Sequence, residues 1–334
     1  MKNEKMWAFF LMLSDHFADD ASGPPRGLYL EKDYRDENRI DLKVWDDTVS
    51  FLAEHKFNTL LIDVGDQVLY ESHPEISAPN AFKKDFVKKM LDGVRAKGLT
   101  PIPKLNFSAC HHTWLREYTR MVGSAPYYKA VSDLIAEVCE LFDTPPFFHL
   151  GLDEEDYDCQ KSCMEKVLIR GADLWWHDLY FYFSEVEKNG VRPWMWSDYF
   201  WRHPKLFLEK MPKSVLQSNW YYNTFRNYPP VPEGLALSDA GYQSNRELLN
   251  AVKQEAYEKL DRAGFDQVPT CSSYTSRRNA FQTMCFCRDH ITDSHLLGFL
   301  TAPWLATDDE HKYAILNDAY RFYNGRRKAY PETL

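Results

Sequence analysis

Three consecutive acids, Asp153, Glu154 and Glu155, follow an apolar stretch that begins at Phe147, directly after two prolines. The stretch has the composition of a buried parallel strand. Because neighbouring side chains on a strand point to opposite faces, Asp153 and Glu154 can share one pocket only where the strand is ending. The pattern therefore predicts a strand whose carboxyl end opens into a polar pocket, where two carboxyl groups are candidates for acid–base chemistry.

The alternative for these acids is a solvated turn or the N-cap of the next helix. We favour catalysis over these alternatives because the strand belongs to a repeating pattern of strands and helices. Apolar runs alternate with amphipathic segments along almost the whole sequence, which predicts a parallel sheet with helical crossovers. Strands are expected at 7–13, 57–64, 99–107, from 147 to the acids, and at 191–197, 214–220, 267–274 and 296–304.

Helices are expected between these strands, at 44–55, 81–97, 127–142, 172–189, 205–210, 245–263, 278–289 and 310–323. Eight strand–helix pairs predict an α/β fold in which residues 1–334 form a single (β/α)8 TIM barrel. The three acids then end its fourth strand. Residues 234–240 also have the pattern of a strand, but their proline-rich lead-in favours a surface hairpin or extended loop.

The hexapeptide His149-Leu150-Gly151-Leu152-Asp153-Glu154 resembles the His-x-Gly-Gly-Asp-Glu signature of the family 20 glycoside hydrolases, the β-N-acetylhexosaminidases, with Leu152 at the second glycine. Residues 51–60 are similar to the segment of that family that leads into the second strand, and Asp66 follows them. Looser matches at the later strands are Trp196, Gln217, Trp220, Tyr274, Gly298 and Trp304. The resemblance spans nearly the whole barrel, and the hexapeptide is its specific part.

The resemblance implies an exo-acting, retaining glycosidase that uses substrate-assisted catalysis. Glu154 would be the general acid/base, while Asp153 would orient the 2-acetamido group of the sugar and stabilise the positive charge that grows on it. Trp196, Trp220 and Trp304 would form apolar walls, which we expect to raise the pKa of Glu154. Core packing is the alternative for each of these tryptophans.

Further substrate contacts follow from the resemblance or from positions at strand ends. Tyr274 would donate a hydrogen bond to the acetamide oxygen, and Arg26 would bind sugar hydroxyls. Asp66, Asp198 and His149 complete the expected substrate-binding residues. Asp198 could instead cap a helix, and His149 could be a hydrogen-bonded core histidine.

Neighbouring polar residues have two interpretations each. His111 and His112 could form a pocket wall or a surface loop, and we expect Glu155 to be a solvated neighbour of the acids.

The chain has Ser276 and Ala306 where the family commonly has acids, with Asp308 and Asp309 slightly beyond Ala306. It also lacks room for the small amino-terminal domain that is usual in the family. These departures leave open which sugar and linkage are recognised, whether the 2-acetamido group is required, and whether the barrel cleaves at all.

Three other functions compete with substrate assistance. A glycosidase with its own nucleophile, acting on a sugar without an acetamido group, commonly places a second acid on the seventh strand, where residues 270–274 contain none. A divalent-metal enzyme would use several side chains at strand ends as ligands. These are His16, Asp63, His111, His149 and Asp153. A third alternative is a barrel that binds sugar without cleaving it.

The composition is that of an ordinary globular protein, with 44% hydrophobic residues and a net charge of −9. No basic stripe or long apolar run is present, so neither nucleic acid nor a membrane is an expected partner. A carbohydrate is the expected partner, the oligomeric state is open (a homodimer included), and no metal or cofactor is expected. Seven cysteines without a framework spacing indicate a reducing compartment. We interpret residues 7–13 as a strand rather than a signal peptide, which predicts a cytoplasmic protein.

Overall fold

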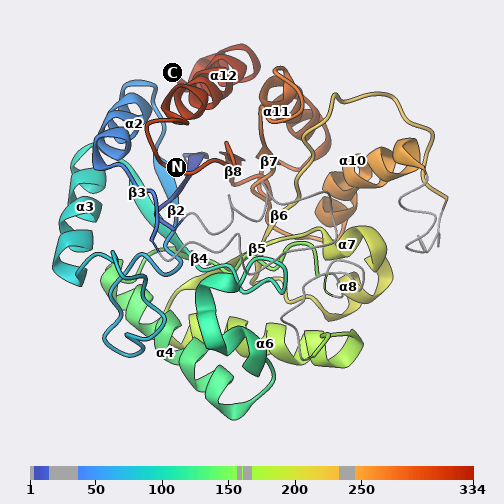
Figure 1. Cartoon of the computed structure of the whole chain (residues 1–334). Coiled ribbons are helices and arrows are strands. Elements are labelled where there is room, and N and C mark those ends of the chain that lie inside the picture. Colours follow the sequence, from blue (N-terminus) through green and yellow to red (C-terminus); the bar gives the residue numbers. More distant parts are fainter. Residues whose placement is uncertain (1–3, 15–36, 156–159, 161–167, 233–244) are drawn as a thin grey trace.

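The computed structural model describes residues 4–14, 37–155, 160, 168–232 and 245–334. Eight parallel strands lie inside a ring of helices (Figure 1), which confirms the predicted TIM barrel. The strands are β1 (Met6–Met12), β2 (Thr59–Asp63), β3 (Thr100–Lys104), β4 (Phe147–His149), β5 (Arg192–Trp196), β6 (Leu216–Ser218), β7 (Thr270–Cys271) and β8 (Gly298–Thr301). Each lies within, or one residue beyond, its predicted range.

The sheet runs in the order β6-β5-β4-β3-β2-β1-β8-β7, and every pairing is parallel. Two isolated parallel bridges, Gln217 with Gln267 and Trp220 with Thr270, connect the two edge strands and bring the barrel close to full closure. The carboxyl ends of all the strands therefore face one end of the barrel, where enzymes with this fold keep their active sites.

The helices follow the predicted segments closely. They are α2 (Leu42–Glu54), α3 (Lys84–Ala96), α4 (Ala125–Leu141), α6 (Ala172–Lys188), α8 (Pro204–Lys210), α10 (Arg246–Arg262), α11 (Asn279–His290) and α12 (Lys312–Ala329). Side chains of Asp41, Ser124 and Asn245 cap the first turns of α2, α4 and α10. The sequence did not predict the 3₁₀ segment η2 (Thr113–Met121) or the short α7 (Tyr199–Arg202). The ambiguous residues 234–240 lie outside the described part.

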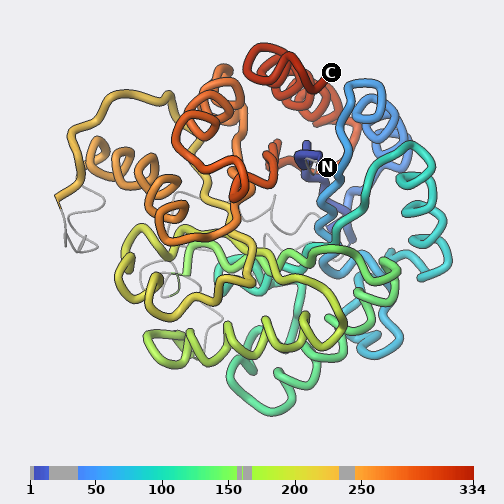
Figure 2. The backbone as a smooth tube through the Cα atoms, turned by 180° about the vertical axis from the view of Figure 1, so that it is seen from behind, coloured from blue at the N-terminus to red at the C-terminus, as the bar shows by residue number. Residues whose placement is uncertain are grey.

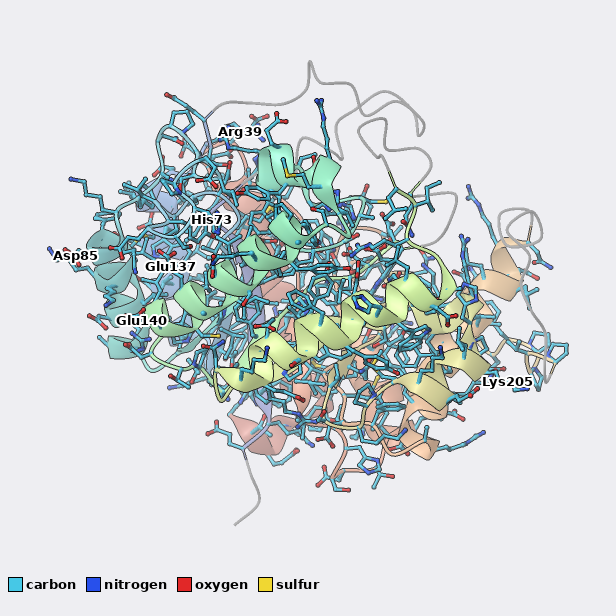
Figure 3. All side chains as sticks on the ribbon, turned by 90° about the horizontal axis from the view of Figure 1, so that it is seen from below. Arg39, His73, Asp85, Glu137, Glu140 and Lys205 are labelled. Atoms are coloured by element: carbon cyan, nitrogen blue, oxygen red, sulfur yellow. The ribbon has the colours of Figure 1, made fainter. Side chains whose placement is uncertain are left out.

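Alternation along the strands divides the core into two layers. On β1, Ala8, Phe10 and Met12 point into the barrel, while Trp7, Phe9 and Leu11 pack against the helices. Figure 2, seen from behind, shows that β1 begins inside the ring of helices and that α12 lies on the ring next to α2. Charged side chains such as Asp85, Glu140 and Lys205 project from the outer surface (Figure 3).

One layer of the barrel interior is polar. The strand register places Asp63, Lys104 and His149 side by side on β2, β3 and β4. The ammonium of Lys104 donates to the Asp63 carboxylate, and its side chain is almost fully buried. Burial, and then the charge of Lys104, lower the pKa of His149 well below its usual value, so this ring is neutral. A buried ion pair and a neutral imidazole therefore lie beneath the carboxyl end of the fourth strand.

Candidate active site

The fourth strand ends at His149, earlier than the predicted end at the acids, and the chain then turns sharply. Gly151, Leu152 and Glu154 all have positive φ angles, of 71°, 69° and 54°. A Cβ atom at position 151 would lie 1.9 Å from Oδ1 of Asn106, so only glycine fits there. Because the chain turns here, neighbouring side chains no longer point to opposite faces as they do in a strand. The side chains of Asp153 and Glu154 can therefore reach one common partner.

That partner is His111, on the loop after β3. Its Nε2 lies 3.5 Å from Oδ2 of Asp153 and 3.3 Å from Oε2 of Glu154. His111 is buried, which supports the pocket-wall interpretation over the surface loop. Nδ2 of Asn106 donates to Oδ1 of Asp153 at 3.0 Å, and the Ser108 hydroxyl donates to the Asp153 carbonyl. Asp153 is thus held as a hydrogen-bond acceptor by the loop of the third strand.

The environment of Glu154 differs from the expectation. Its side chain is 44% exposed, so tryptophan walls do not enclose it. Burial acts instead on Asp198, at the end of β5. Burial first, and then the negative charge of Asp153, raise the pKa of Asp198 to about 7, while the hydrogen bond from the Glu154 backbone opposes the shift. Asp198 occupies the N-cap position of α7 but makes no capping hydrogen bond. Its Oδ2 accepts from the Glu154 N–H at 2.8 Å.

Aromatic rings gather beside these acids. Trp196 is buried, its ring centroid is 4.3 Å from that of His149, and it meets Trp304 edge-on at 5.7 Å. Trp304 also contacts Phe10 in the barrel interior, at 5.1 Å, and Tyr222, at 6.2 Å. These contacts bring Trp196 and Trp304 together, while the role that the resemblance implies for them, as walls of a sugar pocket, stays a prediction.

Tyr222 is a residue to which the sequence analysis gave no role. Burial, followed by the negative charge of Asp153, raises its pKa well above the usual value, so its hydroxyl keeps its proton. Its ring stacks on Trp220 with centroids 5.2 Å apart. The signal was present in the sequence: Trp220 and Tyr222 are two residues apart at the end of a strand, a spacing that puts them on one face.

Trp220 connects the aromatic group to the acids. Its indole Nε1 donates to Oδ1 of Asp198 at 3.3 Å, and its ring also contacts Trp201 edge-on at 4.5 Å. The ammonium of Lys253, on α10, lies 4.0 Å from the ring centroid. Trp220 is therefore positioned from several sides.

The structure does not bring all the predicted residues to this group. Tyr274 is 77% exposed, which is not the environment expected of a pocket wall. Asp66 is fully buried and accepts hydrogen bonds from Ser14, Asn38 and Arg116. His149 is fully buried and accepts from the Gly151 N–H, as expected of a core histidine. Arg26 lies outside the described residues.

Glu155 was expected to be solvated, and that expectation is wrong. It is buried, and Nη2 of Arg170 lies 2.6 Å from its Oε1. A buried carboxylate needs such a partner. Of the positions where the family commonly has acids, Ala306 is fully buried, and nearby Asp308 accepts from His311 at 2.7 Å.

The proposed metal ligands are largely engaged elsewhere. Asp63 pairs with Lys104, and Nδ1 of His149 already accepts a hydrogen bond. Within the described ranges, no group of three or more His, Cys, Asp or Glu side chains could hold a metal ion, and His16 lies outside those ranges.

No helix in the described part of the chain is both long and apolar enough to cross a membrane.

Comparison with protein-family models and with curated proteins gives no match. Solved structures do match in fold. The GH20 exo-β-N-acetylglucosaminidase from Vibrio harveyi, in complex with N-acetylglucosamine, superposes with a TM-score of 0.60 at 12% identity over 99% of this chain. The β-N-acetylhexosaminidase from Bacteroides fragilis gives 0.57 at 12% over 98%, and the GH20 enzyme from Streptomyces coelicolor 0.59 at 11% over 99%.

This chain spans 57% of the Vibrio chain and 70% of each of the other two. The similarity in fold covers the whole (β/α)8 barrel and confirms the structural side of the resemblance. At such low identity the similarity establishes the fold alone.

Proposed function

We propose that this protein is a retaining glycoside hydrolase that removes β-linked N-acetylhexosamine by substrate-assisted catalysis. The observation that carries the proposal is the meeting of Asp153, Glu154 and His111 at the carboxyl end of the barrel, beside Trp196, Trp304 and Tyr222. Acids next to aromatic rings suit a sugar, because the apolar face of a sugar ring packs on an aromatic ring while its polar groups meet the acids.

In the first step, Glu154 donates its proton to the glycosidic oxygen as the bond from that oxygen to the anomeric carbon breaks. The carbonyl oxygen of the 2-acetamido group forms a bond to the anomeric carbon, which gives a cyclic oxazolinium ion and frees the leaving group. Asp153 accepts a hydrogen bond from the acetamide N–H and stabilises the positive charge. Its other oxygen is occupied by Asn106, so its orientation is fixed.

In the second step, water attacks the anomeric carbon while the Glu154 carboxylate takes up a proton from it. The bond from the anomeric carbon to the acetamide oxygen breaks, and the product keeps the β configuration. Partial exposure of Glu154 suits this exchange with water. His111, within 3.5 Å of both carboxylates, can share a proton with either acid.

Tyr222, rather than the exposed Tyr274, is the side chain that we assign to the acetamide oxygen. Burial, and then the negative charge of Asp153, raise its pKa and keep the hydroxyl protonated, and its ring lies 6.2 Å from that of Trp304, centroid to centroid. A hydroxyl donor at this place would stabilise the oxygen before it attacks and hold it in line with the anomeric carbon.

The test is a panel of aryl β-glycosides, with and without the 2-acetamido group, assayed with the wild type and with Glu154→Gln. We expect cleavage of the N-acetylglucosaminide or N-acetylgalactosaminide, and inhibition by a thiazoline analogue of the oxazolinium ion. The variant should lose about 10²- to 10⁴-fold in kcat, the usual contribution of a general acid, and less with leaving groups that need no proton.

Cleavage only of plain glucosides or galactosides would exclude substrate assistance and leave a conventional glycosidase. Binding of N-acetylglucosamine by calorimetry without cleavage of any glycoside would indicate a sugar-binding barrel. Complete loss of activity with a chelator, restored by a divalent metal, would favour the metal-dependent alternative.

A further inference from the structure

Arg170 is a buried arginine that lies just before α6, and only 2% of it is exposed. One of its terminal nitrogens, Nη2, contacts two loops of the candidate site. It donates to the backbone carbonyl of Phe107 at 2.9 Å, on the loop after β3, and to Oε1 of Glu155 at 2.6 Å, on the loop after β4. A single guanidinium thus joins the segment that carries His111 to the segment that carries Glu154.

Glu155 strengthens the same connection. Its Oε1 also accepts from the backbone N–H of Ala109 at 2.6 Å. Ala109 lies two residues before His111, and Glu155 comes directly after Glu154. The Glu155 carboxylate and the Arg170 guanidinium together form a short bridge between the loop that carries His111 and the loop that carries Glu154. Each contact in this bridge is within hydrogen-bond distance.

The other end of the guanidinium is fixed to the helical layer. Nη1 donates to the Tyr182 hydroxyl at 2.7 Å and lies 3.4 Å from Oδ2 of Asp178, both on α6. The backbone of Arg170 is held as well, because the Gln160 side chain accepts from its N–H and donates to its carbonyl, each at 2.7 Å. Arg170 is therefore a fixed point from which the two loops are held.

We infer that Arg170 is a positioning residue, which sets the distance between His111 and Glu154 through Glu155 and the Phe107 carbonyl. The inference rests on the proposed function in taking Glu154 as the acid/base. The planar guanidinium suits this role, since its N–H groups point in fixed directions toward several acceptors at once. A lysine ammonium in the same space has fewer donors and no fixed plane, so it cannot keep the contacts with both loops and with α6 at the same time.

The test compares Arg170→Lys with Arg326→Lys. Arg326 is a matched control: it is also buried and donates to the carbonyl of Lys56, which precedes β2 at the opposite end of the barrel. With an aryl N-acetylglucosaminide, we expect Arg170→Lys to reduce kcat about 100-fold, the cost of a misplacement of about 1 Å, while KM stays within about threefold. Arg326→Lys should leave both constants near the wild-type values.

A second measurement does not depend on activity. In protein labelled with ¹⁵N-histidine, the ring resonances of His111 should move in Arg170→Lys and stay in place in Arg326→Lys. Added guanidinium should return part of the lost kcat to Arg170→Ala. If Arg170→Lys does not fold, Glu155→Ala, which removes the acceptor of the hydrogen bonds from Arg170 and Ala109, should give the same loss of kcat and the same displacement.

The results separate the two proposals. A wild type that cleaves no glycoside, together with displaced His111 resonances in Arg170→Lys, would overturn the function and keep the positioning role. An active wild type whose Arg170→Lys or Glu155→Ala variant retains full kcat and unchanged His111 resonances would overturn the positioning role and leave the function standing.

Discussion

The backbone N–H of Glu154 donates a 2.8 Å hydrogen bond to Oδ2 of Asp198, so the acid that ends β5 fixes the backbone of the candidate acid/base after β4. The other oxygen of Asp198 accepts from Trp220, after β6. One carboxylate therefore joins the ends of three consecutive strands. Because its pKa is raised to about 7, the strength of this junction depends on pH near neutrality.

Asp198→Asn should change how stability depends on pH. The folded-state pKa, about 7, lies above the ordinary value of 3.8, so between these values the folded protein binds the extra proton. Stability from this group is therefore lost as pH rises toward 7. The amide of the variant cannot titrate. We expect the free energy of unfolding of the wild type, relative to the variant, to fall by on the order of 2 kcal/mol between pH 5 and pH 8 in urea denaturation.

Asp47→Asn is the control for this experiment. Hydrogen bonds from Lys312 and Lys43 lower the pKa of Asp47 to about 2, so the carboxylate is ionised throughout the range from pH 5 to pH 8. The difference between wild type and this variant should stay constant there. A difference for Asp198→Asn that is equally constant would contradict the raised pKa.

Gly151→Ala should destabilise the fold more than the left-handed backbone alone requires. The new Cβ would lie 1.9 Å from Oδ1 and 2.9 Å from the backbone Cα of Asn106, whereas at Gly98, which also has a positive φ, nothing lies within 4 Å. Gly98→Ala should cost about 1–2 kcal/mol from strain, and Gly151→Ala a further 1–3 kcal/mol from overpacking. Equal unfolding midpoints for the two variants in a thermal melt would show that Asn106 moves away from the new Cβ atom without loss of stability.

Asn106→Asp should shift the pH profile of activity. The introduced carboxylate could still accept from the N–H groups of Ser108 and Leu152, but it would stand where the Asn106 amide now donates to Asp153 at 3.0 Å. Two carboxylates at that distance share a proton, which raises one pKa of the pair. We expect kcat/KM to fall about tenfold or more at pH 7 and to recover partly at lower pH.

Asn58→Asp provides the comparison. Asn58 precedes β2 at the opposite end of the barrel, where its side chain accepts from the Trp7 N–H and donates to the Lys5 carbonyl. This substitution should lower stability without moving the pH profile of kcat/KM. If both variants kept the wild-type pH profile of kcat/KM, the hydrogen bond from Asn106 to Asp153 would not contribute to catalysis.

Tyr222→Phe should lower kcat with N-acetyl substrates by about 10²-fold, the usual loss when one donor to a developing charge is removed. The ring remains, so the stacking on Trp220 at 5.2 Å should persist. Tyr274→Phe is the matched change on the exposed tyrosine and should leave kcat within about twofold. The reverse result in steady-state kinetics would return the acetamide contact to Tyr274.

Local features of the sequence were enough to predict the barrel. Residues 7–13 form an unbroken apolar run, and such a run marks a strand that is buried on both faces whatever its neighbours are. The run of acids predicted that the fourth strand ends there, because three charged residues cannot continue a strand that is buried on both faces, and the strand ends earlier still, at His149.

Only the tertiary structure decided which side chains meet. Glu155 and Glu154 are neighbours of one type in the sequence, yet Glu155 is buried against Arg170 while Glu154 is partly exposed beside His111, because positive φ angles turn the chain here. Likewise Tyr222 lies beside Trp304 while Tyr274 is exposed. Burial and pairing depend on residues far apart in the chain, and local periodicity carries no information about which loops close over the end of the barrel.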